Sequence, residues 1–289
     1  MNGIYSCIIA VSMYSKIPMP TVEWTQERMR YVMCFFPAVG LAEGLLMGLW
    51  FYAGMDVFGL APWTVALVGT AIPILVTGGI HMDGFMDTMD GLHSYGSREK
   101  KLEILKDPHL GAFAVISLAV YLLLYLAAAG EYALCLAAAP GETRKVLYMV
   151  PTLFFVTERA LSGLSVVCFP PAKKDGLAAG FAQAAKKRTD TLVLILWLAA
   201  CAVAVCAAGI CGFPGAGYLA VTVGGVQLLV FLWYYRMSLS QFGGMTGDLA
   251  GCFLQICELA SFGAVAVLLK SGALLHNLST VFFVVDLPF

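Results

Sequence analysis

Three aspartates, Asp83, Asp87 and Asp90, are spaced four and three residues apart in the polar stretch from Gly78 to Gly111. On an α-helix they would project at about 0°, 40° and −20°, along one narrow strip. Like charges this close repel one another, and a divalent cation with oxygen ligands is the usual compensation. The spacing predicts a metal site, with Mg²⁺ expected where phosphate is also bound. Surface acids on a solvated helix and an ion-coupling site in a transporter are the alternatives.

A second polar patch runs from Gln241 to Asp248 and again combines glycines with a carboxylate before an apolar run. A helix N-terminus there would direct its backbone amides outward, which suits phosphate. Asp248 would either add a metal ligand or cap the helix. The predicted phosphate-binding residues of this patch are Gly243, Gly244, Thr246 and Gly247.

Five further residues carry weaker predictions. Asp107-Pro108 reads as an N-cap followed by the first helical residue, which places Lys106 where an anion would be favoured. Arg159 lies in an apolar run and would bind phosphate with two parallel hydrogen bonds. Glu258 would be a proton acceptor, a metal ligand or the buried partner of Arg159. His81 is a weak ligand candidate, because it would lie on the helix face opposite Asp83.

The composition identifies an integral membrane protein. The 289 residues are 60% hydrophobic and 12% charged, with a mean hydropathy of +0.85, which is too apolar for a soluble domain. The net charge of −1 and the absence of a long basic run argue against a nucleic-acid partner. The expected fold is an all-α, polytopic bundle of about seven to eight spans, with short interfacial or re-entrant helices, forming one domain over residues 1–289.

Most of the basic residues fall in the segments that alternate spans would place on one side. With the N-terminus inside, thirteen of the seventeen lysines and arginines lie on the inner side, which is the cytoplasmic side by the positive-inside rule. Both polar patches then emerge on that side and would form one site. The apolar spans are expected near 31–54, 62–80, 108–130, 145–169, 190–212, 217–236, 249–270 and 272–287, with an interfacial helix over 3–15.

Several segments resemble the cobalamin synthase family, also called adenosylcobinamide-GDP ribazoletransferase. The most characteristic is TGGIHMDGFMDTMDGL, followed by KLEILKDPHLGAFAV; further matches are YSKIPMP at 14–20, FPAVG at 36–40 and GGMTGDLAGCFLQICEL at 243–259. The resemblance covers nearly the whole chain.

The resemblance implies an Mg²⁺-dependent transfer. Adenosylcobinamide-GDP would be joined to α-ribazole, or to its 5′-phosphate, giving adenosylcobalamin or its 5′-phosphate and GMP. Asp83, Asp87 and Asp90 would hold the metal, and Asp248 would complete the site or orient the nucleophile. The protein would be a multi-pass protein of a bacterial or archaeal cytoplasmic membrane, with the lipid bilayer as a partner and its active site facing the cytoplasm. A homo-oligomer, or a complex with other cobalamin-assembly enzymes, is compatible with this expectation.

Three rival functions are less compatible with the sequence. A CDP-alcohol phosphatidyltransferase expects an arginine after its DG element, but Asp83-Gly84 is followed by Phe85-Met86-Asp87. An aspartate-rich intramembrane transferase expects two aspartate-rich repeats, and the second patch has only Asp248. A cation-coupled transporter usually has internal repeats and ionisable groups near the bilayer midplane.

Overall fold

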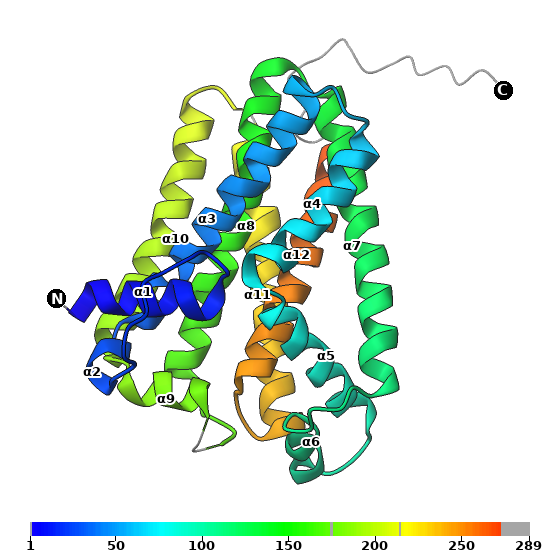
Figure 1. Cartoon of the computed structure of the whole chain (residues 1–289). Coiled ribbons are helices and arrows are strands. Elements are labelled where there is room, and N and C mark those ends of the chain that lie inside the picture. Colours follow the sequence, from blue (N-terminus) through cyan, green and yellow to red (C-terminus); the bar gives the residue numbers. More distant parts are fainter. Residues whose placement is uncertain (1, 174–175, 214, 273–289) are drawn as a thin grey trace.

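A computed structural model describes residues 2–173, 176–213 and 215–272 of the chain (Figure 1). These residues are almost entirely helical, apart from connecting segments and an isolated β-bridge between Pro171 and Met245. The elements are α1 (Asn2–Tyr14), α2 (Gln26–Met29), α3 (Val32–Tyr52), η1 (Ala53–Val57), α4 (Pro62–Thr77), α5 (Ile80–His93), α6 (Arg98–Ile104), α7 (Ala112–Ala138), α8 (Gly141–Cys168), α9 (Leu177–Ala184), α10 (Lys187–Ile210), α11 (Ala216–Met237), η2 (Ser238–Phe242) and α12 (Gly247–Lys270).

Six stretches are long and apolar enough to cross a membrane: α3 with η1, α7, α8, α10, α11 with η2, and α12. The pair α4 and α5 also passes this test, but its two helices meet at an angle of 93°. The described residues therefore contain six spans, or seven if the bent pair is one broken span. This confirms the predicted polytopic helical bundle.

Glycines set the tightest helix contact. Gly40, Gly44 and Gly48 of α3 face α8, and a Cβ on any of them would collide with atoms of that helix. Small residues at four-residue spacing let membrane helices approach closely. The α3–α8 pair consequently forms the centre of the bundle.

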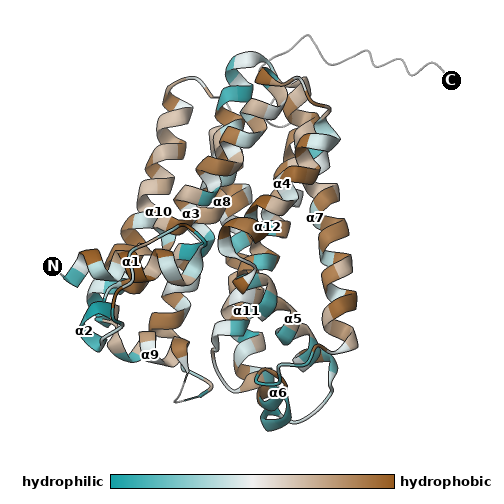
Figure 2. Cartoon of the chain, viewed as in Figure 1, coloured by the Kyte–Doolittle hydropathy of each residue, from teal (hydrophilic) through white to brown (hydrophobic). Residues whose placement is uncertain are grey.

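Polar segments gather at one end of the bundle. Figure 2 shows many hydrophilic residues around α2, α5 and α6, while the ribbons of α7 and α10 are mostly brown to tan, the colours of apolar residues. Only 6% of the most apolar window of α10 is buried inside the protein, so most of its apolar side chains lie on the surface of the bundle. Helix α1 lies across the long helices (Figure 1), as expected for an interfacial helix.

The bend between α4 and α5 depends on two glycines. Gly78 and Gly79 have φ values of 66° and 80°, a left-handed conformation that costs glycine least. The backbone amide of Lys16 donates to the carbonyl of Val76 in the last turn of α4, which ties the N-terminal segment to the bend. The bend sends the aspartate-bearing α5 away from the axis of α4.

The structure moves both boundaries of one predicted span. The third predicted span begins at Ala112 instead of Pro108, and it continues to Ala138 instead of ending near residue 130. The predicted span at 272–287 lies outside the described residues, apart from Gly272.

Candidate functional site

Helix α5 packs directly on the first turns of α12. Gly84 and Gly251 lie at this crossing, where a Cβ would approach the backbone of Asp248 and of His81, respectively. All three aspartates of the first patch lie on α5, as predicted, and Asp248 lies in the first turn of α12. The two polar patches, far apart in sequence, therefore meet.

The carboxylates form a strongly negative group. The charges of Asp83, Asp248 and Asp90 all act on the carboxyl of Asp87, and Asp83 and Asp248 line the same cavity. Within the described ranges, no three His, Cys, Asp or Glu side chains converge closely enough to form a ready-made metal cage. Mg²⁺ commonly binds through one or two carboxylates with substrate phosphates and water, so the donor set still fits this ion.

Asp90 has a structural role that was not predicted. Its Oδ2 accepts a hydrogen bond of 2.6 Å from the amide of Gly111, and its Oδ1 accepts one of 2.8 Å from the amide of Ala114. Asp90 thus caps the N-terminus of α7 from another helix. A Cβ on Gly111 would collide with this carboxylate. The metal role predicted for Asp90, with Asp83 and Asp87, stays a prediction, and the carboxylate has this second role of satisfying amides of α7.

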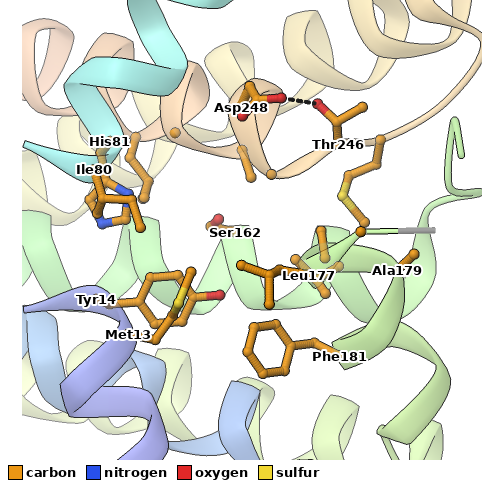
Figure 3. Close-up of a pocket in the computed structure, with 18 of the residues that line it drawn as sticks. Met13, Tyr14, Ile80, His81, Ser162, Leu177, Ala179, Phe181, Thr246 and Asp248 are labelled. Atoms are coloured by element: carbon orange, nitrogen blue, oxygen red, sulfur yellow. Dashed lines mark hydrogen bonds between the residues drawn. The ribbon is translucent and has the colours of Figure 1, made fainter. Parts of the chain in front are cut away.

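A cavity of about 310 Å³ opens beside the carboxylates. Its walls come from α1, α3, α5, α8, α9 and α12 and from the segments before α9 and α12. Figure 3 shows Asp248 and Thr246 along one wall and Tyr14, Met13 and Phe181 along the opposite one, with Ser162 between them. The cavity therefore has a polar wall and an apolar wall.

The second patch is divided between the cavity and a structural turn. Thr246 caps α12, because its hydroxyl accepts from the amide of Leu249 at 3.3 Å; the alternative that Asp248 is the cap is wrong. Thr246 and Gly247 line the cavity. Gly243 ends η2 with a φ of 79°, and Gly244 packs against the Pro170–Ala172 segment. These two glycines shape the turn and do not line the cavity.

Lys173 is a cavity residue that no motif in the sequence singled out. It lines the cavity, and its positive charge acts on Asp248. Its ammonium group also donates to the carbonyl of Leu102 at 3.1 Å. The cavity therefore contains a lysine beside its carboxylates.

Lys106 and Asp107 lie away from this cavity. Both are exposed in the connection between α6 and α7. Asp107 does not begin α7; it accepts hydrogen bonds from the backbone amide and the ring of His109, and these bonds lower the pKa of Asp107. The prediction of a helix start at Asp107-Pro108 is wrong, because α7 begins at Ala112 and its cap comes from Asp90. Anion binding by Lys106 stays a prediction that has lost this helix start as its support.

Arg159 is enclosed in an ion-pair cluster. Its guanidinium contacts Glu158 at 2.5 Å, Glu43 at 2.7 Å and Glu258 at 3.7 Å. All four side chains are at most 1% exposed. The prediction that Arg159 binds phosphate is therefore wrong, and the alternative pairing of Glu258 with Arg159 is confirmed.

His81 lies in the cavity wall, although it was expected on the face opposite Asp83. It is 4% exposed, and its Nε2 has no hydrogen-bond partner in the part of the chain that the structure describes. Its ring lies 5.9 Å from those of Tyr14 and Phe36, measured between centroids. An enclosed polar atom without a partner is costly, which marks Nε2 as a contact point for a ligand.

The apolar wall was missed by reasoning from charged residues. Tyr14, Phe36 and Phe181 bring their rings together from α1, α3 and α9, at centroid distances of 4.2 Å for Tyr14–Phe36 and 6.4 Å for Tyr14–Phe181. Two of them lie in the segments 14–20 and 36–40 that carry the family resemblance. That resemblance is the one signal in the sequence that marks Tyr14 and Phe36.

The fold and the site together define a polytopic membrane protein whose helices build a carboxylate-lined cavity at the polar end of the bundle. Sequence comparison identifies the family. A family model described as cobalamin-5-phosphate synthase matches residues 6–266, and the chain belongs to this family.

Curated relatives agree with this family. A protein of Lachnoclostridium phytofermentans named adenosylcobinamide-GDP ribazoletransferase is 42% identical over 278 residues, which cover 96% of this chain and 98% of the relative. Relatives of the same name from Brevibacillus brevis and Pseudomonas entomophila are 31% and 33% identical, covering 91% and 90% of this chain and 96% and 98% of theirs. No solved structure matches the chain.

Proposed function

We propose that this protein is a membrane-bound adenosylcobinamide-GDP ribazoletransferase. The observation that carries the proposal is the meeting of the two family-like patches, with Asp83 and Asp248 lining one cavity. Family membership and the names of the relatives support it. The acceptor is α-ribazole or its 5′-phosphate, and the product is adenosylcobalamin or its 5′-phosphate.

The transfer requires one bond to form and one to break. A ribose hydroxyl of the acceptor attacks the phosphorus that carries the cobinamide, and the bond from that phosphorus to the bridging pyrophosphate oxygen breaks. The bridging oxygen leaves with GMP, and a carboxylate of the site takes the hydroxyl proton as general base. Asp83 and Asp248 are the candidates, because both line the cavity.

Asp83, Asp87 and Asp248 would hold Mg²⁺. Their mutual repulsion and their oxygen donors suit this ion. When bound, Mg²⁺ would neutralise negative charge on the pyrophosphate and on the leaving GMP. Thr246 and Gly247 border the same wall, and Lys173 adds a positive charge beside it.

The site would face the cytoplasm across the bacterial or archaeal inner membrane. The basic residues of 98–106 and 186–188 lie at the polar end of the bundle, in and directly after α6 and at the start of α10 (Figure 1), and the positive-inside rule makes that end the inner one. A nucleotide-linked, water-soluble donor would then reach the cavity from the cytoplasm.

The test is a turnover assay on the full chain in nanodiscs with adenosylcobinamide-GDP and α-ribazole, following GMP and the corrinoid product by chromatography. We expect both products in equal amounts with Mg²⁺ and none after chelation, with activity restored by added Mg²⁺. Absence of product from monodisperse, folded protein with either form of the acceptor would reject the proposal. Transfer to a diacylglycerol-type alcohol instead would favour a phosphatidyltransferase.

A further inference from the structure

The apolar wall of the cavity has the form of a site for a flat, weakly polar ring. Tyr14, Phe36 and Phe181 form a continuous aromatic group, and Met13 and Leu177 extend it (Figure 3). Aromatic side chains bind planar rings by offset or edge-to-face stacking. Such a wall exceeds what a phosphate or a metal ion alone would need.

One polar atom in this region has no partner. His81 Nε2 is enclosed and lacks a hydrogen-bond partner among the described residues, and His81 is 4% exposed. With its proton on Nε2, the ring would donate one hydrogen bond to a ligand. His81 thus offers a planar ring one hydrogen-bonding point, beside the hydroxyls of Tyr14 and Ser162, which also line the cavity (Figure 3).

The cavity volume suits a ligand of the size of a nucleoside. Ligand pockets span roughly 300–1,000 Å³ for drug-sized molecules, and this cavity of about 310 Å³ lies at the lower end. A corrinoid ring with its side chains is far too large for it. The cavity accepts one heterocycle with its ribose.

We infer that this cavity binds the acceptor nucleoside, with its dimethylbenzimidazole against Tyr14, Phe36 and Phe181, the free ring nitrogen accepting from His81 Nε2, and the ribose directed toward Asp83 and Asp248. The inference rests on the proposed function and states where the acceptor nucleoside binds. Dimethylbenzimidazole has one free ring nitrogen and two methyl groups, which matches this wall. Guanine has several donors and acceptors that this wall would leave unpaired.

The charge distribution supports the same orientation. A ribose hydroxyl is neutral and can lie beside the carboxylates without adding charge, next to the pyrophosphate that the proposed Mg²⁺ would hold there. The wall that carries Asp248 and Thr246 lies opposite the aromatic wall (Figure 3). A nucleoside bound with its base in the apolar half therefore presents its hydroxyls to the candidate general bases.

The decisive test compares two acceptors in the full chain: α-ribazole, and the corresponding indole riboside in which carbon replaces the free ring nitrogen. We expect the wild-type protein to prefer α-ribazole by about tenfold in kcat/KM, the loss of one hydrogen bond. His81→Phe keeps an aromatic ring but has no donor, so the preference should fall to about one. If His81 had a purely structural role, His81→Phe would lower kcat/KM equally for both acceptors and leave the preference unchanged.

A second variant tests the aromatic wall without His81. Phe181→Leu should raise the KM for α-ribazole about tenfold and leave the KM for adenosylcobinamide-GDP within about twofold. The matched control is Phe113→Leu, because Phe113 belongs to another aromatic pair, with His93, but lies outside the cavity and is 44% exposed. This arm remains informative if His81→Phe does not fold.

The outcomes separate this inference from the proposed function. Turnover with an unchanged α-ribazole KM in Phe181→Leu and an unchanged acceptor preference in His81→Phe would overturn the inference alone. A raised KM for adenosylcobinamide-GDP would show that the cavity holds the guanine. If the wild-type protein forms no product, the proposed function fails, and calorimetric titration of α-ribazole into wild type and Phe181→Leu then decides whether the cavity binds it.

Discussion

Gly84 of α5 lies directly against Asp248 of α12: a Cβ on Gly84 would be 2.8 Å from both the Cα and the carbonyl oxygen of Asp248. This contact is between backbones, so it does not depend on how either carboxylate is charged. It holds Asp248 beside the aspartates of α5 even though their charges repel. Packing between the two helix backbones therefore holds the carboxylates close together against their electrostatic repulsion.

Gly84→Ala should separate the two helices. The added methyl group cannot be accommodated without moving α5 or α12, which typically costs about 1–3 kcal/mol of stability. We expect a lower unfolding temperature in nanodiscs and a large loss of GMP release. Gly263→Ala is the matched control, since Gly263 is on α12 with no atom within 4 Å of a Cβ; equal effects of the two variants would contradict this explanation.

Asp87→Asn should remove activity while preserving the fold. The carboxyl of Asp87 is repelled by Asp83, Asp248 and Asp90, so neutralising it relieves repulsion. We expect an unfolding temperature equal to or above that of the wild type without Mg²⁺, together with a decrease in turnover of about 100-fold or more. Full activity in this variant would remove Asp87 from the site.

Asp90→Ala and Asp107→Ala should differ in stability. Asp90 satisfies two amides at the start of α7, and loss of such a cap costs about 1 kcal/mol. Asp107 bonds only the nearby His109, so its replacement should be nearly neutral. Thermal unfolding and hydrogen exchange of the first turn of α7 measure the difference; protection of that turn unchanged in Asp90→Ala would refute the capping role.

Arg159→Met should destabilise the bundle severely, because it leaves Glu43, Glu158 and Glu258 buried without their cation. Removing one partner of a buried ion pair costs roughly 3–5 kcal/mol. Changing the three glutamates to glutamine in the Arg159→Met background should recover much of this loss. Yield of monodisperse protein and unfolding temperature report both steps, and a failure to recover would mean that the geometry of the guanidinium matters beyond its charge.

Lys173→Ala should distinguish the two acceptors. Lys173 is the lysine that lines the cavity, and a 5′-phosphate on the acceptor adds negative charge that it can neutralise. We expect the KM for α-ribazole 5′-phosphate to rise several-fold more than the KM for α-ribazole, as measured by GMP release. Lys145→Ala is the control, because its salt bridge to Glu142 is exposed and lies at the start of α8.

Local signals were sufficient for most of the fold. The apolar runs predicted the spans. The spacing of Asp83, Asp87 and Asp90 correctly indicated a helix. Each of these properties depends on residues that are close together in the sequence.

The errors involve partners that are distant in sequence. Asp107-Pro108 has the local form of a helix start, but Asp90 caps α7 from 21 residues upstream. Arg159 seemed available for phosphate because Glu43 lies 116 residues away. The aromatic wall joins α1, α3 and α9, and no spacing rule relates such residues before the helices are packed.

The bend after α4 has a consequence for the surrounding lipid. The 16 residues of α4 extend about 24 Å, and the 27 residues of α7 about 40 Å. A bilayer has a hydrocarbon thickness of about 30 Å. The two helices therefore differ in hydrophobic length, and we expect the bilayer to thin beside α4 and α7 to tilt. We therefore expect membrane thickness to act most directly on α4, the helix that leads through the bend into α5 and its aspartates.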